Sequence, residues 1–527
     1  MRWRLAIVYR LRKGRGGKQK QQETCDIESI KGDKRINQAF QIRIRAAEFE
    51  KNLPLPNHTC NGDEELYPNK IASYSKGLPH NNLGEVDLDA YHALIRSLTT
   101  GNPADFEHIH LGGDRKLVNP QAALAFGLEG PDSHHLAIPP APTFSSAEEA
   151  SEMGELYWQS LTRDVSFTEY DANPITQRAA ADLSGFSDFR GPKIGEQVTT
   201  GTLFRGETSG DLVGPYISQF LLKDVPYGAM TIVQRYRTTS PGDDCMIRYA
   251  DWLAVQNGAF TVPNQFDPTL RYIRNGRDLS EYLHQNFTYQ AFLNASLILL
   301  GMGSPIDTMN PYKNSLTQSG FITFGSAHIL HLVATVAICA LRAAWYKKWL
   351  VHRRLRPEVF GGRIHNHRTG VASYPFHSDI MNSSVLDVVF NKNGTYLLPI
   401  AYPEGSPTHP SYPAGHATVA GACATVLKAF FNETFVIPNP VVTSADGLLL
   451  LPYKGPDLTV GSELDKLASN FAIGRDAAGV HWRSDSIKGL KLGEAVAIGI
   501  LTEMRSTYNE KFGGFSLTKF DGMTITI

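Results

Sequence analysis

This sequence has almost no excess of one charge over the other, few cysteines and no long unbroken apolar run. Its 527 residues include 51 Lys and Arg and 52 Asp and Glu, and the net charge of −1 gives no general attraction to nucleic acid or to an acidic membrane. The cysteines are odd in number and widely spaced, so neither a disulfide framework nor a zinc site is predicted. They are Cys25, Cys60, Cys245, Cys339 and Cys423.

The most apolar stretch, residues 329–349, is not a convincing membrane span. His331 and Arg342 interrupt it, so it falls short of the roughly 18 unbroken apolar residues that a span needs. We therefore predict a buried core helix at this position and no membrane span.

The first 20 residues depart from the even balance of basic and acidic residues, because eight of them are Lys or Arg and none is acidic. Their apolar run, LAIVY, is too short for the hydrophobic region of a signal peptide. We predict a basic, poorly ordered extension over residues 1–45, which turns helical toward its end. A targeting or contact segment is the alternative. Residues 46–527 are predicted to form a single domain, and the compartment is left open.

Apolar residues at helical spacing dominate the remaining chain. Ser145 or Ser146 is expected to cap a helix over residues 147–165. Further helices are predicted over residues 229–236, 243–258 and 278–301, up to Arg353, after His416 and from about Ser486. Residues 356–415 are predicted to be loop, and the few strand-like segments are residues 201–206, 435–442 and 523–527. The pattern predicts a mainly α fold with long wrapping loops.

Three short segments carry residues suited to binding an anion. Residues 347–358, KKWLVHRRLRPE, gather basic side chains at a helix end. Residues 409–421, HPSYPAGHATVAG, bring a histidine to the start of a helix, where the first amides have no intrahelical partner. Residues 473–485, IGRDAAGVHWRSD, place a carboxylate four residues after a histidine, on one face if that stretch is helical. Taken singly, each segment is also explained by structure alone: a basic helix end, a helix-start histidine and a surface ion-pair cluster.

Together the three segments predict one site for a tetrahedral oxyanion. His481 would donate an electron pair to the central atom, while Asp485 accepts from its other ring nitrogen. His416 would lie opposite as a general acid and base. The predicted oxyanion donors are Lys348, Arg356, Arg475 and the amide of Gly415.

This arrangement resembles the vanadium-dependent haloperoxidases, which share their site with the type 2 phosphatidic acid phosphatases. Arg356-Pro357 and the spacing of Arg475, His481 and Asp485 match that pattern, and Lys348 lies eight residues before Arg356, as in the algal bromoperoxidases. Segments such as KGLPHNNLGEV, KLVNPQAALAFGLEGPDS, PAPTFSSAEEASEMGELYW, WYKKWLVHRRLRPE and PTHPSYPAGHAT are similar to the red-algal and cyanobacterial bromoperoxidases. The similarity extends over residues 45 to 510.

The resemblance implies two packed four-helix-type bundles with the site within residues 345–485. It also implies vanadate bound covalently to His481 and held by the predicted donors, with His416 managing protons. Hydrogen peroxide would then oxidise bromide, and by extension iodide or chloride, to a hypobromous species that halogenates small organic acceptors. His409 and Trp345 would border the halide path. A homo-oligomer, up to a dodecamer, and a structural calcium ion are further implications.

One departure from the family pattern stands out, because Ala414 occupies the place of the usual serine before Gly415. The missing hydroxyl would weaken vanadate binding by about tenfold. The rival function is an acid phosphatase with His481 as nucleophile, and a third is a vanadate-site relative acting as a binding or isomerase-type protein. His365 and His367 are expected in a loop at the rim of the site. Asp278 and His284 are candidate partners of His416.

Overall fold

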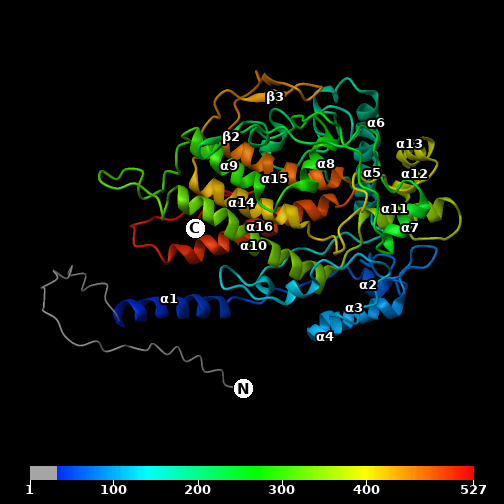
Figure 1. Cartoon of the computed structure of the whole chain (residues 1–527), viewed down its shortest axis with the longest axis horizontal. Coiled ribbons are helices and arrows are strands. Elements are labelled where there is room, and N and C mark those ends of the chain that lie inside the picture. Colours follow the sequence, from blue (N-terminus) through cyan, green and yellow to red (C-terminus); the bar gives the residue numbers. More distant parts are fainter. Residues whose placement is uncertain (1–32) are drawn as a thin grey trace, which may run out of the picture. The chain divides into compact units, whose positions relative to one another are not determined.

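Residues 33–527 are described by the computed structural model of the chain (Figure 1). Contacts divide the chain into two units, Met1–Lys51 and Asn52–Ile527. The described part of the first unit is helix α1 (Asp33–Lys51). The predicted basic extension falls largely on residues 1–32, which lie outside the described residues, as does Cys25. Residues 33–45 are helical, and the domain boundary at residue 46 stays a prediction.

The main bundle consists of α10 (Ser326–Tyr346), α14 (Gly415–Phe430), α15 (Val460–Ala477) and α16 (Arg483–Arg505). Helix α14 contacts the other three and is almost wholly buried (Figure 1). A Cβ atom on Gly493 would lie 1.9 Å from the carbonyl oxygen of Thr418, and one on Gly421 would lie 2.1 Å from that of Leu490. Glycine at these two positions therefore lets α14 and α16 pack backbone to backbone.

A second core surrounds α5 (Ala147–Thr162), which packs against α6 (Pro174–Ser184), α12 (Ser378–Asn382) and α13 (Ser384–Asn393). The side chain of Ser146 accepts a hydrogen bond from the Glu149 amide at 3.1 Å, so the predicted cap is confirmed. Three acidic side chains of α5, those of Glu149, Glu152 and Glu155, are buried with its apolar ones.

The remaining elements are short. The α-helices are α2 (Asp63–Leu66), α3 (Leu88–Thr100), α4 (Pro103–Phe106), α7 (Tyr249–Gln256), α8 (Gly276–Gln285), α9 (Gln290–Gly301) and α11 (Pro357–Arg368), and a π-helical turn, Lys347–His352, follows α10. The 3₁₀ turns are Pro120–Leu124, Ser133–His135, Phe167–Glu169, Ser209–Leu212 and Gln219–Leu221. Antiparallel pairs join β1 (Val225–Tyr227) to β2 (Met230–Ile232), β3 (Val441–Thr443) to β4 (Leu450–Pro452), and β5 (Ser516–Thr518) to β6 (Thr524–Thr526). The prediction of a mainly α fold with few short strands is confirmed.

Several local predictions are wrong. Residues 229–236 are not a helix, because Gly228 takes a left-handed turn (φ 61°) that folds β2 back onto β1. Residues 201–206 form turns, and the strand within residues 435–442 begins only at Val441. The predicted loop over residues 356–415 contains α11, α12 and α13.

The predicted helix over residues 278–301 is two helices, α8 and α9. Asn286 leaves the helical conformation at φ −65° and ψ 146°, and its amide still bonds the carbonyl of Tyr282 at 3.0 Å. The loop between the two helices carries Asn286 and Thr288 to the site described below.

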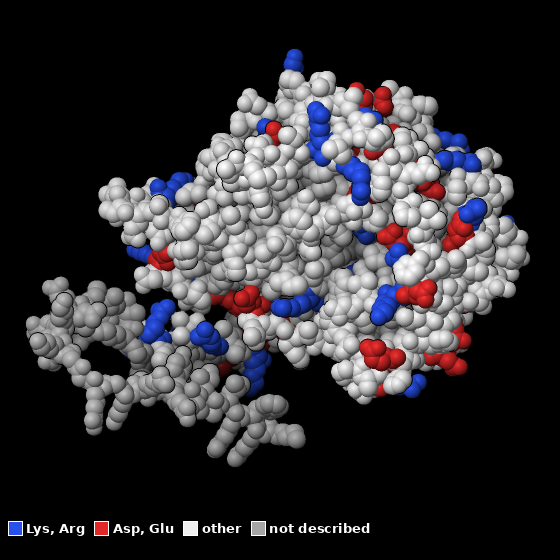
Figure 2. Space-filling view, viewed as in Figure 1, with Lys and Arg blue, Asp and Glu red and all other residues white. Residues whose placement is uncertain are grey.

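By length and composition, the segment Ser326–His352 could cross a membrane, and 56% of its most apolar window is buried inside the protein. Its burial in the main bundle agrees with the predicted core helix. On the face shown in Figure 2, basic and acidic side chains are scattered among neutral ones.

Candidate oxyanion-binding site

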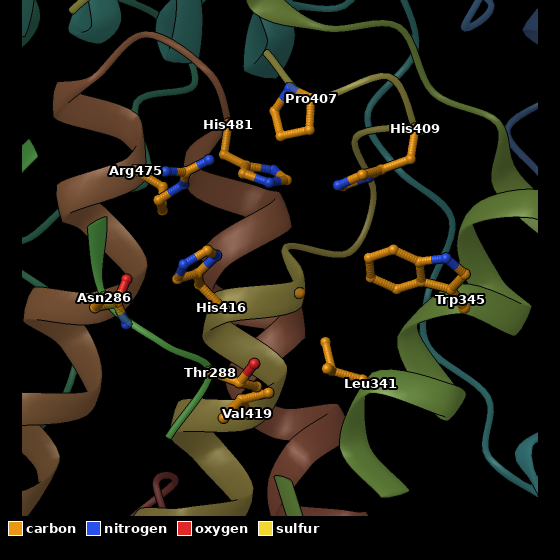
Figure 3. Close-up of a pocket in the computed structure, with 11 residues that line it drawn as sticks. Asn286, Thr288, Leu341, Trp345, Pro407, His409, His416, Val419, Arg475 and His481 are labelled. Carbon is orange, nitrogen blue, oxygen red and sulfur yellow. The ribbon is translucent and has the colours of Figure 1, made fainter. Parts of the chain in front are cut away.

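Several helix ends converge on one cavity of about 220 Å³ (Figure 3). The end of α10 and the π-helical turn bring Trp345 and Lys348, and the residue before α11 is Arg356. Helix α14 begins at Gly415, α15 ends near Arg475, and α16 begins just after His481. The cavity is lined by Asn286, Thr288, Leu341, Trp345, Pro407, His409, Gly415, His416, Val419, Arg475 and His481. Lys348, Arg356 and Asp485 lie behind these lining residues.

A carboxylate fixes the orientation of His481. The Nδ1 atom of His481 lies 2.8 Å from Oδ2 of Asp485, and its Nε2 atom lies 3.0 Å from the Nη1 donor of Arg356. This pairing selects the tautomer in which Nδ1 carries the proton and Nε2 presents a lone pair toward the cationic cluster. Burial, followed by the charge of Arg356, lowers the pKa of His481 well below its usual value, so the ring stays neutral.

Three cationic side chains surround this histidine, and none forms an ion pair within residues 33–527. Lys348 donates to the carbonyls of Pro410 and Ser411 at 2.8 and 2.6 Å. Arg356 donates to the carbonyls of Val480 and His409 at 2.6 and 3.1 Å. Arg475 donates to Leu283 O at 3.1 Å and to the Tyr402 hydroxyl at 3.0 Å, and its buried Nε has no partner.

Burial of unpaired cations is costly, and it lowers the pKa of a cationic side chain. Burial lowers the pKa of Lys348 well below its usual value, and Arg356 reinforces the effect. Burial likewise lowers the pKa of Arg356 to about 10. An anion in the cavity would supply the missing counter-charge.

The start of α14 adds backbone donors. Thr418 is the first residue whose amide bonds back into the helix, to the carbonyl of Ala414 at 3.0 Å. The amide of Gly415 therefore remains free to donate to a bound anion. Ala414 is the residue that precedes the helix, and its methyl group provides no side-chain cap.

Two histidines occupy opposite sides of the cavity (Figure 3). His416 is partly exposed to the cavity, and its ring forms no hydrogen bond within the described residues. The Nδ1 atom of His409 lies 3.0 Å from Nη2 of Arg356, and its ring lies 4.8 Å from that of Trp345. Burial, then neighbouring cations, lowers the pKa of both histidines well below the usual value. Each is therefore a neutral base at neutral pH.

The structure also contributes residues that the sequence did not single out. Ser411 donates to Asp485, and Arg354 donates to the other carboxylate oxygen of Asp485 at 2.8 Å. Both residues lie within segments already singled out, residues 347–358 and 409–421, and that was the available signal. Asn286 and Thr288 had no such signal, because they reach the cavity only through the break between α8 and α9.

Other sequence candidates lie elsewhere. His365 and His367 are on α11, not in a loop, and their Nδ1 atoms accept from the backbone amides of Tyr396 and Tyr374. His284 pairs with Glu404 at 2.7 Å, not with His416. Asp278 accepts from Thr238 at 2.6 Å. Within residues 33–527 no group of three or more His, Cys, Asp and Glu side chains is arranged to hold a metal ion.

A histidine held by a carboxylate, facing unpaired cations and helix-start amides, is the set of groups that an enzyme needs in order to bind a tetrahedral oxyanion. A family model described as the VCPO second helical-bundle domain matches residues 328–510. The vanadium-dependent bromoperoxidase of Corallina pilulifera is 38% identical over 590 residues, which cover 94% of this chain and 98% of that protein. The vanadium-dependent bromoperoxidase of Ascophyllum nodosum is 37% identical over 540 residues, which cover 96% of this chain and 95% of that protein.

The fold agrees with these relatives. A solved homohexameric structure of the second vanadate-dependent bromoperoxidase from Ascophyllum nodosum superposes with a TM-score of 0.90 at 30% identity, covering 98% of this chain and 94% of that one. The chain belongs to the vanadium-dependent bromoperoxidase family.

Proposed function

We propose that this chain is a bromoperoxidase that binds vanadate in the cavity and oxidises bromide with hydrogen peroxide. The observation that carries the proposal is the set of buried cations that have no carboxylate partner among the described residues, arranged around the unprotonated Nε2 of His481. The name shared by relatives over nearly the whole chain supports the same reaction.

Vanadate fits this donor set. A tetrahedral oxyanion offers several acceptor oxygens, and Lys348, Arg356, Arg475 and the Gly415 amide would hold them. His481 Nε2 would be the ligand to vanadium, and Asp485 would keep that nitrogen free of its proton. When bound, vanadate supplies Lewis-acid activation of peroxide toward a halide.

The protein side chains would manage protons and halide. His416 has a neutral ring that no described residue hydrogen-bonds, so it can take a proton from entering peroxide and return one to the product. Lys348 would polarise the bound oxygens as an ammonium group. Bromide, and iodide or chloride in its place, would approach along the side bordered by Trp345 and His409, whose rings touch at 4.8 Å between centroids. The product would be a hypobromous species that halogenates small organic acceptors.

The test is bromination of monochlorodimedone by protein stripped of anions and then titrated with vanadate. We expect bromination to require vanadate and to decline when phosphate competes for the same donors. Hydrolysis of p-nitrophenyl phosphate without any bromination would contradict the peroxidase and support the phosphatase alternative.

Assembly and calcium are secondary parts of the proposal. One similar bromoperoxidase is a homohexamer, which supports a homo-oligomer here, and a dodecamer stays a prediction. Light scattering of the purified chain distinguishes a hexamer from a dodecamer. The structural calcium ion also stays a prediction, and a melting temperature that EDTA leaves unchanged would contradict it.

A further inference from the structure

Behind His481 lies a buried network of polar groups that joins the two cores, and of these groups the proposed chemistry uses only Asp485. Its centre is the guanidinium of Arg354, a residue that is 3% exposed. The Nη1 atom of Arg354 donates to Oδ1 of Asp485 and to the hydroxyl of Ser484, both at 2.8 Å. Its Nη2 atom donates to two carboxylates of α5, those of Glu149 and Glu152.

Glu152 also caps a helix to which it does not belong. Trp482 precedes α16 and provides no oxygen for a cap. Instead Oε1 of Glu152 accepts from the amide of Ser484 at 2.7 Å, and Oε2 accepts from the Ser484 hydroxyl at 2.9 Å. The start of α16, and with it Asp485, is therefore held by a side chain from the other core.

The network bears on His481 through charge as well as position. Arg354 draws electron density from Asp485, which weakens the pull of that carboxylate on the His481 Nδ1 proton. A negative Glu152 beside Arg354 offsets this effect. Resting on the proposed function, we propose that Glu152 and Arg354 are positioning residues for His481, which orient Asp485 and set how strongly His481 binds vanadate.

The ionisation of Glu152 gives this role a signature. Burial raises its pKa to about 7, with Glu148 and Asp485 adding to the shift, while Arg354 and Ser484 oppose it. The charged or titratable groups that face it are Arg354, Glu148, Glu149, Asp485, Tyr412 and, through its pair with Glu148 at 3.0 Å, Arg190. Below pH 7 Glu152 becomes neutral and loses its influence on Arg354.

Glu155 provides a matched control. It lies on the same face of α5, one turn after Glu152, is equally buried, and also binds the start of α16. Its carboxylate accepts from Arg483 at 2.7 and 2.5 Å, but it does not contact Arg354, Ser484 or Asp485. A purely structural role would therefore affect Glu155→Gln and Glu152→Gln alike.

The experiment is calorimetric titration of the full-length, anion-free chain with vanadate, and with inorganic phosphate as a second probe, at pH 8 and pH 5.5. We expect Glu152→Gln to weaken vanadate binding at pH 8 by roughly tenfold, as outer partners of a ligand histidine commonly do. At pH 5.5 parent and variant should converge, because glutamine imitates the neutral acid. Glu155→Gln should match the parent at both pH values.

Equal losses in Glu152→Gln and Glu155→Gln, or a loss in Glu152→Gln that does not depend on pH, would overturn the inference. If Glu152→Gln does not fold, Ser484→Ala keeps the amide contact and removes the hydroxyl link, and vanadate binding about threefold weaker is expected. Parent-level affinity in Ser484→Ala would then overturn it. A parent chain that binds neither probe would overturn the proposed function itself, whereas tight binding by the parent with no change in the variants overturns only the role of Glu152 and Arg354.

Discussion

Replacing Ala414 with serine adds one hydroxyl at the start of α14, directly before the amide that faces the cavity. Ala414 is fully buried, and its backbone is fixed at both ends. Its amide donates to the carbonyl of Asp485 at 3.0 Å, and its carbonyl accepts from Thr418 at 3.0 Å. The hydroxyl of Ala414→Ser would therefore enter a rigid frame.

Two effects are expected from that hydroxyl. As an N-cap it would accept from the Ala417 amide and stabilise the protein by about 0.5 to 2 kcal/mol. As a donor to an oxyanion it would add about 1.4 kcal/mol, which is a tenfold gain in vanadate affinity. The two effects are compatible, because a hydroxyl donates through its proton and accepts through a lone pair.

The assay is titration of anion-free Ala414→Ser and parent protein with vanadate, together with melting temperatures measured without vanadate. Ala424→Ser is the control, because it lies on the same helix, is as buried as Ala414 and is about 15 Å further along. It should leave the affinity unchanged. A higher melting temperature for Ala414→Ser without tighter binding would refute the reasoning that the residue at this position faces the oxyanion.

Three further predictions follow from the same geometry. His416→Ala should lower kcat for bromination by about 10²- to 10⁴-fold while vanadate affinity changes little, because its ring makes no hydrogen bond within residues 33–527. Steady-state kinetics and calorimetry check this, and lost binding would contradict it. Inorganic phosphate at 100 times its Kd for the parent should stabilise the anion-free parent chain by about 2.7 kcal/mol, because it neutralises unpaired cations. At the same phosphate concentration the gain should be smaller in Arg475→Leu, as measured by thermal unfolding. An equal gain in that variant would contradict the assignment. Burial lowers the pKa of His328 to about 4, so its contribution to stability is present above pH 6.5 and is lost as pH falls from 6.5 toward 4, at about 1.4 kcal/mol per pH unit. Urea unfolding measured across this range should give a slope of the free energy of unfolding against pH that is smaller by one proton in His328→Gln. An unchanged slope would contradict the prediction.

The sequence predicted the site well where a functional residue lies next to a proline or glycine that marks the end of a helix. Pro357 starts α11 beside Arg356, and Gly415 with its preceding prolines sets the start of α14. The predicted contact of His481 with Asp485 is present at 2.8 Å, although α16 begins only at Arg483, so the two residues do not share a helical face as the spacing had suggested. These features are local, so a short window of residues determines them.

The unpredicted parts depend on contacts between distant segments. The break at Asn286 follows an uninterrupted apolar pattern, so periodicity alone predicts one helix where the structure has α8 and α9. Two carboxylate partners of Arg354, Glu149 and Glu152, come from α5, about 200 residues earlier in the chain, as the separation of 205 from Glu149 shows. The strand pair β1–β2 depended on the left-handed turn at Gly228, which the helical pattern of its neighbours concealed.

The most direct test of the central claim is the stoichiometry with which vanadate restores bromination to the anion-free chain, measured in parallel with His481→Ala. The account predicts that bromination rises linearly and saturates at one vanadate per chain. In His481→Ala the cations should still bind vanadate weakly, but bromination should be absent. Bromination by the vanadate-free chain, or full bromination by His481→Ala, would contradict the claim that His481 and its surrounding cations form a vanadate-dependent catalytic site.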